Sequence, residues 1–123
     1  MATMQSQGAS GARDAAAGEP PIDLTHLFRM TLGDHALERE VLALFDRQID
    51  LLMARMTEVE PSSVAALAHT LKGSARGVGA WPMARAAEAV EAASPGELAA
   101  AVAALAAAAD ATRAAVADIL GTA

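Results

Sequence analysis

The chain has 123 residues, enough for one ordinary domain with a single core but not for two. Hydrophobic residues make up 54% of it and aromatic residues only 2%, which favours closely packed helices over a β-sandwich or barrel. A formal net charge of -6 argues against nucleic acid as a partner, because concentrated lysine and arginine bind a phosphate backbone. The absence of cysteine excludes disulfides and thiolate zinc sites.

Residues 1–20 mix Gly, Ser, Gln and Ala without an apolar face, so we expect a disordered tail followed by one domain over residues 21–123. The tail lacks the basic start and continuous apolar run of a signal peptide. The sequence has no long apolar stretch free of polar interruption, so it predicts no membrane span. We therefore expect a soluble, cytoplasmic monomer with neither a membrane nor a nucleic-acid partner.

The first two predicted helices begin at aspartates. Asp23, preceded by the apolar Ile22, starts a short helix that ends near Gly33. Asp34 caps a long helix that ends before Pro61, with apolar residues at spacings of three, four and seven. The predicted apolar residues are Leu24, Leu27 and Phe28 in the short helix and Leu37, Val41, Leu44, Phe45, Leu51, Leu52 and Met56 in the long one.

Three further helices follow. One begins at "EPSS" and stops at Gly79, the next has Pro82 in its first turn, and the "SPGE" of residues 94–97 reads as the N-cap, N1 proline and capping-box glutamate of the last. The short connections predict an all-α protein, an antiparallel up-and-down four-helix bundle with the short first helix packed across one end. Its predicted apolar positions are Val64, Leu67, Ala68, Leu71, Ala75 and Val78, then Met83, Ala86, Ala87 and Val90, then Leu98, Val102, Leu105, Ala109, Thr112, Val116 and Ile119.

His69 is the candidate functional residue. A helical projection at 100° per residue places it about 150° from the apolar stripe of its own helix, so the imidazole faces outward. Gly73 and Arg76 lie within about 40° of it and Lys72 within about 60° on the same projection. A glycine inside a helix costs roughly 1 kcal/mol relative to alanine, so Gly73 indicates a local need for free space beside the ring. An open imidazole flanked by a cation predicts reversible capture of a phosphoryl group.

The segment "AHTLKGSARGVGAWPMARAAEAVE", residues 68–91, resembles the signature of histidine-containing phosphotransfer (HPt) domains. In that family an alanine, the phosphoaccepting histidine, a leucine, a lysine and a glycine lead to a small residue, a Gly-Ala pair and a later glutamate. Gly77 departs from the family, which usually has a larger residue there, and Trp81 follows the Gly-Ala pair. The matching positions are Ala68, His69, Leu71, Lys72, Gly73, Ser74, Ala75, Gly79, Ala80 and Glu91.

The resemblance implies a phosphoryl carrier and not an enzyme. Such a domain takes the group from the receiver-domain aspartate of a hybrid histidine kinase, holds it on the residue matching His69, and delivers it to the receiver aspartate of a response regulator. The lysine matching Lys72 helps to stabilise the phosphoryl group, and the glycine matching Gly73 leaves room for the receiver. The Mg²⁺ belongs to the receiver, so no cofactor or metal is expected here.

Partner binding is expected on the exposed side of the His69 helix together with the polar side of the helix before it. Ala65 and Ala66 would form a shallow rim, and Ser74 and Arg76 complete the candidate contact residues. Trp81 is predicted to close the end of the core. His26 and His35 lack a carboxylate or second histidine at i+4, so they predict no metal site.

Two alternatives remain open. In the first, the chain is a helical module that binds and inhibits a receiver or kinase without carrying phosphate. In the second, it is the phosphoacceptor part of a histidine kinase. The second fits poorly, because "TLKG" follows His69 in place of an acidic residue and proline, and no nucleotide-binding region follows. We therefore expect no ATP-dependent autophosphorylation.

Overall fold

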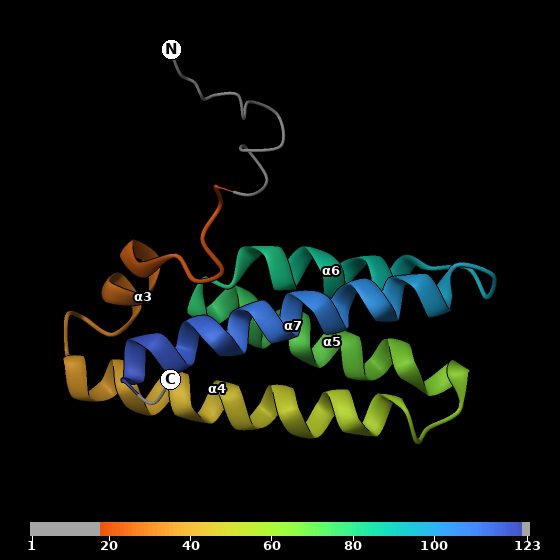
Figure 1. Ribbon diagram of the computed structural model, residues 1–123, viewed down its shortest axis with the longest axis horizontal. Helices are drawn as coiled ribbons and strands as arrows, with labels where there is room; N and C mark the ends of the chain where they lie inside the picture. The colour runs from red at the N-terminus through yellow and green to blue at the C-terminus, as the bar shows by residue number, and fades with distance from the viewer. Residues whose placement is uncertain (1–17, 122–123) are drawn as a thin grey trace, which may run out of the picture.

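The computed structural model describes residues 18–121, which contain five α-helices and no strand. The four longer helices form an antiparallel bundle, and the short α3 lies across one end of it (Figure 1). The predicted all-α class is confirmed, whereas most of the predicted tail, residues 1–17, lies outside the described residues. The helices are α3 (Leu24–Met30), α4 (His35–Met56), α5 (Pro61–Val78), α6 (Trp81–Ala92) and α7 (Leu98–Leu120).

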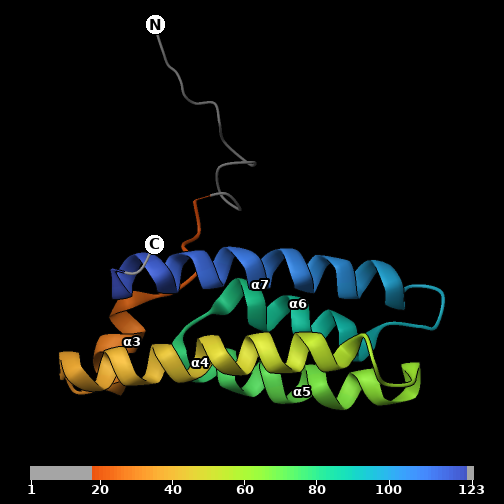
Figure 2. The same cartoon turned by 60° about the horizontal axis from the view of Figure 1, so that its bottom comes forward.

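The order of packing follows the chain. Helix α5 packs mainly against α6 and also against α4, and α7 closes the bundle by packing on α6 and α4. Figure 2 shows α7 lying along the side of the bundle opposite α5. The outward surface of α5 around His69 is therefore left open.

Side-chain caps define the beginnings of α3 and α4. The Asp23 carboxylate accepts a hydrogen bond from the backbone N–H of His26, and the Asp34 carboxylate accepts one from Leu37, each at 3.1 Å. These bonds satisfy N–H groups that have no partner within the helix. Helix α5 passes through Gly77 and ends at Val78 because Gly79 adopts a φ of +85°, in the left-handed region that favours glycine.

The predicted start of the last helix is wrong by several residues. Helix α7 begins at Leu98, and Ser94 and Glu97 close a turn before it instead of capping it. The backbone N–H of Ser94 donates to the Glu97 carboxylate, and that of Glu97 donates to the Ser94 carbonyl, both at 2.9 Å. Of the two hydrogen bonds of the expected capping box, only the one from the Ser94 backbone N–H to the Glu97 side chain is formed, because these bonds fold residues 94–97 into a turn.

The predicted apolar face of α4 is partly wrong. Leu44 and Leu51 are each 60% exposed and Leu37 is 41% exposed. These three leucines recur every seven residues and lie about a third of a turn away from the core-facing row, so the bundle does not cover them. The α4 residues that enter the core are Leu42, Phe45, Ile49, Leu52 and Met56.

The same correction applies to α3, where Leu27 is buried while Leu24 and Phe28 are more than half exposed. A helix of two turns that contacts the bundle on one side buries only that side. The predicted stripes of α5 and α6 are buried or half-buried throughout. In α7 only the last residue of the predicted stripe, Ile119, is exposed.

Helix α7 is long and apolar enough to cross a membrane by length and composition alone, and it is the one such helix within residues 18–121. Its apolar character comes from alanine, and Leu105, Ala109 and Val116 are buried in the bundle. Arg113 lies within it and forms ion pairs with Asp46 at 2.8 Å and Asp50 at 3.3 Å, both on α4. These ion pairs and buried side chains hold α7 against the rest of the bundle.

Hydrogen bonds and a ring contact hold α3 against the connection between α5 and α6. The Trp81 indole N–H donates to the Asp23 carboxylate at 3.0 Å, and the Asp23 backbone N–H donates to the Gly79 carbonyl at 2.8 Å. The His26 ring also packs edge-on against Trp81 and donates from Nε2 to the Gly77 carbonyl at 3.0 Å. The indole is the main reason that the pKa of Asp23 lies below its ordinary value. Trp81 therefore closes this end of the bundle through α3.

Candidate functional site

The His69 side chain lies on the outward face of α5 and is 70% exposed. Its helix neighbours Ala68 and Leu71 are fully buried, which fixes the side of α5 that faces the core. Because residues on one helix are related by 100° per residue, burial of that side directs the imidazole to solvent. The outward orientation predicted for His69 is confirmed.

One carboxylate from α6 contacts both His69 and Lys72. Glu91 Oε2 lies 2.7 Å from His69 Nδ1, and Glu91 Oε1 lies 2.6 Å from Lys72 Nζ. Residues three apart on α5 present these groups side by side, and the close packing of α5 on α6 brings the glutamate between them. Glu91 and Lys72 are largely covered while the imidazole is open to solvent.

The carboxylate settles which imidazole nitrogen carries the proton. The Lys72 ammonium, and after it the His69 ring, hold the pKa of Glu91 below its ordinary value, so this group is ionised at neutral pH and only accepts hydrogen bonds. The contacting nitrogen, Nδ1, is therefore the N–H donor. Within residues 18–121 no group bonds to Nε2, which leaves its lone pair available at the surface.

Lys72 is expected from the sequence to be an exposed cation that flanks the imidazole, and its exposure is contradicted by the structure. Its ammonium ion pairs with Glu91, and its side chain is only 15% exposed. The long aliphatic stem is covered while the charge finds a carboxylate, which is the usual way a lysine becomes largely buried. Its part in stabilising a phosphoryl group stays a prediction.

Two glycines leave α5 bare on the side of His69 that leads toward its C-terminus. A Cβ atom added at Gly73 or Gly77 would meet no atom within 4 Å outside its own stretch of helix. Both positions are helical without a positive φ, so neither the backbone nor packing within this chain requires glycine there. Contacts within residues 18–121 therefore do not explain the glycine at either position.

The other predicted contact residues lie around this face without forming one cluster. Ala65 and Ala66 are exposed one turn before His69, and Ser74 is half-buried on the side toward α4. Arg76 lies on the opposite side of α5, 3.6 Å from Glu88 of α6. Both partners of that pair are more than half exposed, so it contributes little to stability.

Glu91 belongs to the candidate site, although helical spacing does not predict it there. In the sequence it is only a matching position of the signature, 22 residues from His69 along the chain. Helical spacing relates residues on one helix, whereas this contact depends on how α6 packs against α5. The one signal available was an acidic residue at a fixed distance from the histidine in a recognised pattern.

No group of three or more metal-binding side chains occurs within the described part of the chain. His26 bonds to a backbone carbonyl, and the exposed His35 pairs through Nδ1 with Glu38 of its own helix at 3.0 Å. Neither histidine meets a second imidazole or enough carboxylates to hold a cation.

Comparison with known proteins gives one match. The model of the Hpt domain family matches residues 36–119, which is more than half of the chain and includes α5, α6 and nearly all of α4 and α7. No curated protein and no solved structure shows significant similarity to the chain. Hpt domains act in phosphorelay signalling, where they interact with receiver domains and are phosphotransfer carriers rather than kinases. Together with the all-helical fold and the exposed histidine, this match shows that the chain belongs to the Hpt domain family.

Proposed function

We propose that His69 is the phosphoacceptor of this Hpt domain and carries a phosphoryl group between the aspartates of two receiver domains. The observation that supports this most strongly is that the two ring nitrogens of His69 differ in their contacts. Nδ1 is hydrogen-bonded to the Glu91 carboxylate, while Nε2 is free at the surface. An imidazole held in this tautomer presents a nucleophile without any need for a base to remove a proton.

The transfer step balances with these groups alone. The Nε2 lone pair attacks the phosphorus of the receiver's aspartyl phosphate, an N–P bond forms, the acyl P–O bond breaks, and the aspartate leaves as a carboxylate. The ring keeps its Nδ1 proton and becomes cationic, and the Glu91 carboxylate 2.7 Å away stabilises that charge. The reverse sequence returns the group to a second receiver.

Lys72 supplies a positive charge next to the transferred group. In the resting protein Glu91 holds its ammonium at 2.6 Å, so the charge is kept within one helical turn of the reacting ring. A phosphoryl group on Nε2 brings negative charge that competes with Glu91 for this ammonium. The Mg²⁺ that assists transfer would be bound by the receiver, and no residue of this chain is assigned to it.

The proposed partners are the receiver domains of a hybrid histidine kinase and of a response regulator, in the cytoplasm and with this protein as a monomer. The α4 side of the proposed contact face is less polar than expected, because Leu44 and Leu51 of α4 are each 60% exposed. Ala65 and Ala66 add small exposed apolar surface one turn before His69. A face of this kind suits a brief encounter that buries less than about 1,200 Å².

The test is label transfer from a receiver domain carrying ³²P on its aspartate. Wild-type protein is expected to acquire an acid-labile, base-stable label, and His69→Gln is expected to acquire none. His35→Gln is the matched control, because that histidine is also exposed and also paired through Nδ1 with a glutamate. Equal labelling of wild type and His69→Gln contradicts the proposal. Stoichiometric binding without labelling would instead support an inhibitory module.

ATP provides a second check. Incubation of the protein with γ-labelled ATP and Mg²⁺ is expected to leave it unlabelled, since a carrier receives its phosphoryl group from a receiver. ATP-dependent labelling of His69 would show that the chain acts as a kinase.

A further inference from the structure

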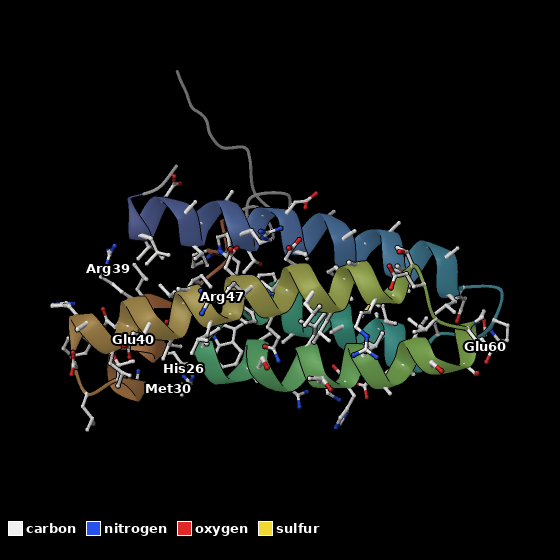
Figure 3. The ribbon with its side chains drawn as sticks, turned by 90° about the horizontal axis from the view of Figure 1, so that it is seen from below. His26, Met30, Arg39, Glu40, Arg47 and Glu60 are labelled. Carbon is white, nitrogen blue, oxygen red and sulfur yellow. The ribbon has the colours of Figure 1, made fainter. Side chains whose placement is uncertain are left out.

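An open hollow lies between α4 and α7, on the side of the bundle away from His69. It encloses about 350 Å³, and no residue of α5 lines it. Figure 3, seen from below, shows α7 and α5 on opposite sides of α4. Because the helices pack around the bundle in the order α4, α5, α6, α7, the α4–α7 side lies opposite the α5–α6 side, where His69 meets Glu91. A molecule in this hollow therefore leaves His69 uncovered.

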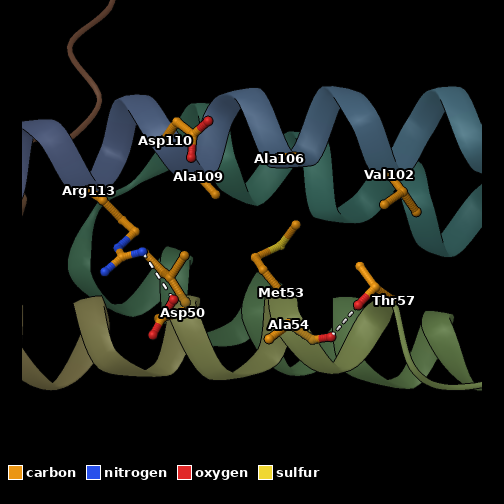
Figure 4. A pocket seen from close by; sticks show the side chains of 10 residues that line it. Asp50, Met53, Ala54, Thr57, Val102, Ala106, Ala109, Asp110 and Arg113 are labelled. Atoms are coloured by element: carbon orange, nitrogen blue, oxygen red, sulfur yellow. Dashed lines mark hydrogen bonds and ion pairs between the residues drawn. The ribbon is translucent and has the colours of Figure 1, made fainter.

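Most of the hollow is apolar because α7 contributes small side chains to it. Ala106 and Ala109 line it from α7, and a methyl group fills little of the space between two helices. Met53 of α4 and Val102 of α7 point into the space and form its walls (Figure 4). This part of the hollow therefore fits aliphatic groups.

One end of the hollow is acidic. Asp50 and Asp110 line it there with Arg113, whose guanidinium pairs with Asp46 at 2.8 Å and with Asp50 at 3.3 Å. Three carboxylates around one guanidinium give this end a formal charge of -2. The Asp50 side chain is 71% exposed and Asp110 is also exposed, so both can meet a group from outside. A cation is favoured at this end and an anion is disfavoured.

The dimensions of the hollow match a row of side chains. On α4 it extends from Ile49 to Thr57, which is about 12 Å along the helix axis. Spread over that length, 350 Å³ gives a mean cross-section of about 30 Å², less than half that of a helix about 10 Å in diameter. A helix lying over the hollow inserts side chains at i, i+4 and i+7, which span about 10.5 Å. Length and width therefore fit the anchors of one helix.

We propose that the α4–α7 hollow docks an amphipathic helix of a partner protein that carries one lysine or arginine and, at helical spacing, two aliphatic side chains. The basic side chain lies against Asp50 and Asp110, and the aliphatic ones pack beside Met53 and Val102. This inference goes beyond the proposed function, because such a partner holds the domain while His69 on the opposite side stays free for phosphoryl transfer. Helices with an acidic residue in place of the basic one are excluded by repulsion.

The probe is a synthetic 18-residue helical peptide of alanine and glutamine, with one lysine and with leucine four and seven residues after it. Titration into the ¹⁵N-labelled chain is expected to shift the backbone amide resonances of residues that line the hollow and not those around His69. Replacement of the peptide's lysine by glutamate is expected to raise Kd about tenfold, since an attraction at the acidic end becomes a repulsion.

Variants of the protein test the two parts of the hollow separately. Ala106→Leu fills the apolar part and is expected to raise Kd for the lysine peptide about tenfold, the effect of losing most of one buried aliphatic contact. The matched control is Ala103→Leu, an exposed alanine of α7 outside the hollow, which should leave Kd unchanged. The double variant Asp50→Asn, Asp110→Asn should bind the lysine and glutamate peptides with similar Kd. Far-ultraviolet circular dichroism confirms that each variant is folded.

Phosphoramidate tests whether the hollow and the histidine face are separate. This small donor transfers its phosphoryl group to imidazole with release of ammonia. Saturation with the lysine peptide is expected to leave the rate of His69 labelling unchanged, because the peptide lies on the opposite side of the bundle. A peptide that slows this labelling has bound the histidine face, which overturns the inference.

Peptide binding is measured without any phosphoryl donor, so it stands or falls independently of the proposed function. No shift at the hollow, equal Kd for the lysine and glutamate peptides, or an unchanged Kd for Ala106→Leu overturns the inference. A wild-type dimer in sedimentation that Ala106→Leu converts to monomer also overturns it, because the hollow would then hold a second copy of this chain.

Discussion

Replacement of Gly73 by alanine should make the protein more stable and a poorer phosphoryl acceptor from receivers. Gly73 is inside the 18-residue helix α5, has no positive φ, and leaves nothing within 4 Å of an added Cβ. The substitution therefore gains the helix-propensity difference of about 0.5–1 kcal/mol without a clash. For a domain of about 100 residues this raises Tm by roughly 2–8 °C.

The functional effect has the opposite sign. The added methyl projects from the turn that follows His69, where a receiver's active site must approach Nε2. A displacement of about 1 Å at a reacting centre can cost about 10²-fold in rate, so transfer from a phosphorylated receiver should fall by about ten- to hundredfold. Labelling by phosphoramidate should change much less, because that donor is small.

Thermal unfolding followed by circular dichroism and receiver-transfer kinetics measure the two effects. Gly79→Ala is the control of opposite sign, because Gly79 has a φ of +85° and an added Cβ would lie 3.1 Å from the Asp23 carbonyl oxygen. That variant should lose about 1–2 kcal/mol of stability from the left-handed conformation alone. If Gly73→Ala does not stabilise, the helical environment derived for residue 73 is wrong. If it stabilises but accepts phosphate from receivers at the wild-type rate, Gly73 does not provide access.

Three further predictions concern Glu91 and the core of α4. Glu91→Gln should slow phosphoryl transfer from a receiver to His69 and weaken the preference of the ring for the Nδ1–H tautomer. The tautomer is measured by ¹⁵N NMR of the imidazole, and unchanged ring shifts would contradict the role of the carboxylate. Because Lys72, and secondarily His69, lowers the pKa of Glu91 in the folded state, its contribution to the free energy of unfolding is present above about pH 4.5 and disappears as the pH falls through the folded value. The stability difference between wild type and Glu91→Gln, from urea titrations, should therefore be retained near neutral pH and shrink only in acid, and a difference that grows in acid would refute the sign. Leu42→Ala, at a fully buried position, should cost about 2–5 kcal/mol of unfolding free energy, whereas Leu44→Ala, at a position 60% exposed, should cost under about 1 kcal/mol; similar losses would show that the core row of α4 is assigned incorrectly.

The sequence was sufficient for the helical class, the number of helices and most of their ends. Asp23 and Asp34 are strong N-caps, Gly79 is a strong C-terminal stop, and these signals act through bonds to nearby backbone groups. The outward direction of His69 followed in the same way, because burial on one side of α5 determines which residues face solvent. Local geometry decides each of these features.

The core row of α4 could not be read from its periodicity alone. Both the row containing Leu42 and Ile49 and the row containing Leu44 and Leu51 have helical spacing and similar hydrophobicity. Which row is buried depends on where α5 and α7 lie around α4. The exposed row that results is also what makes the face beside His69 apolar.

By itself, then, the sequence determined that a bundle helix presents an open imidazole beside a glycine, since spacing along one helix is enough to establish that. Only the tertiary structure decided the state of that imidazole, because Glu91 comes from a different helix and reaches Nδ1 of His69 and the ammonium of Lys72 through the packing of α6 on α5. A hydrogen bond between residues far apart in the chain requires their helices to be docked in one register, and no local pattern specifies that register.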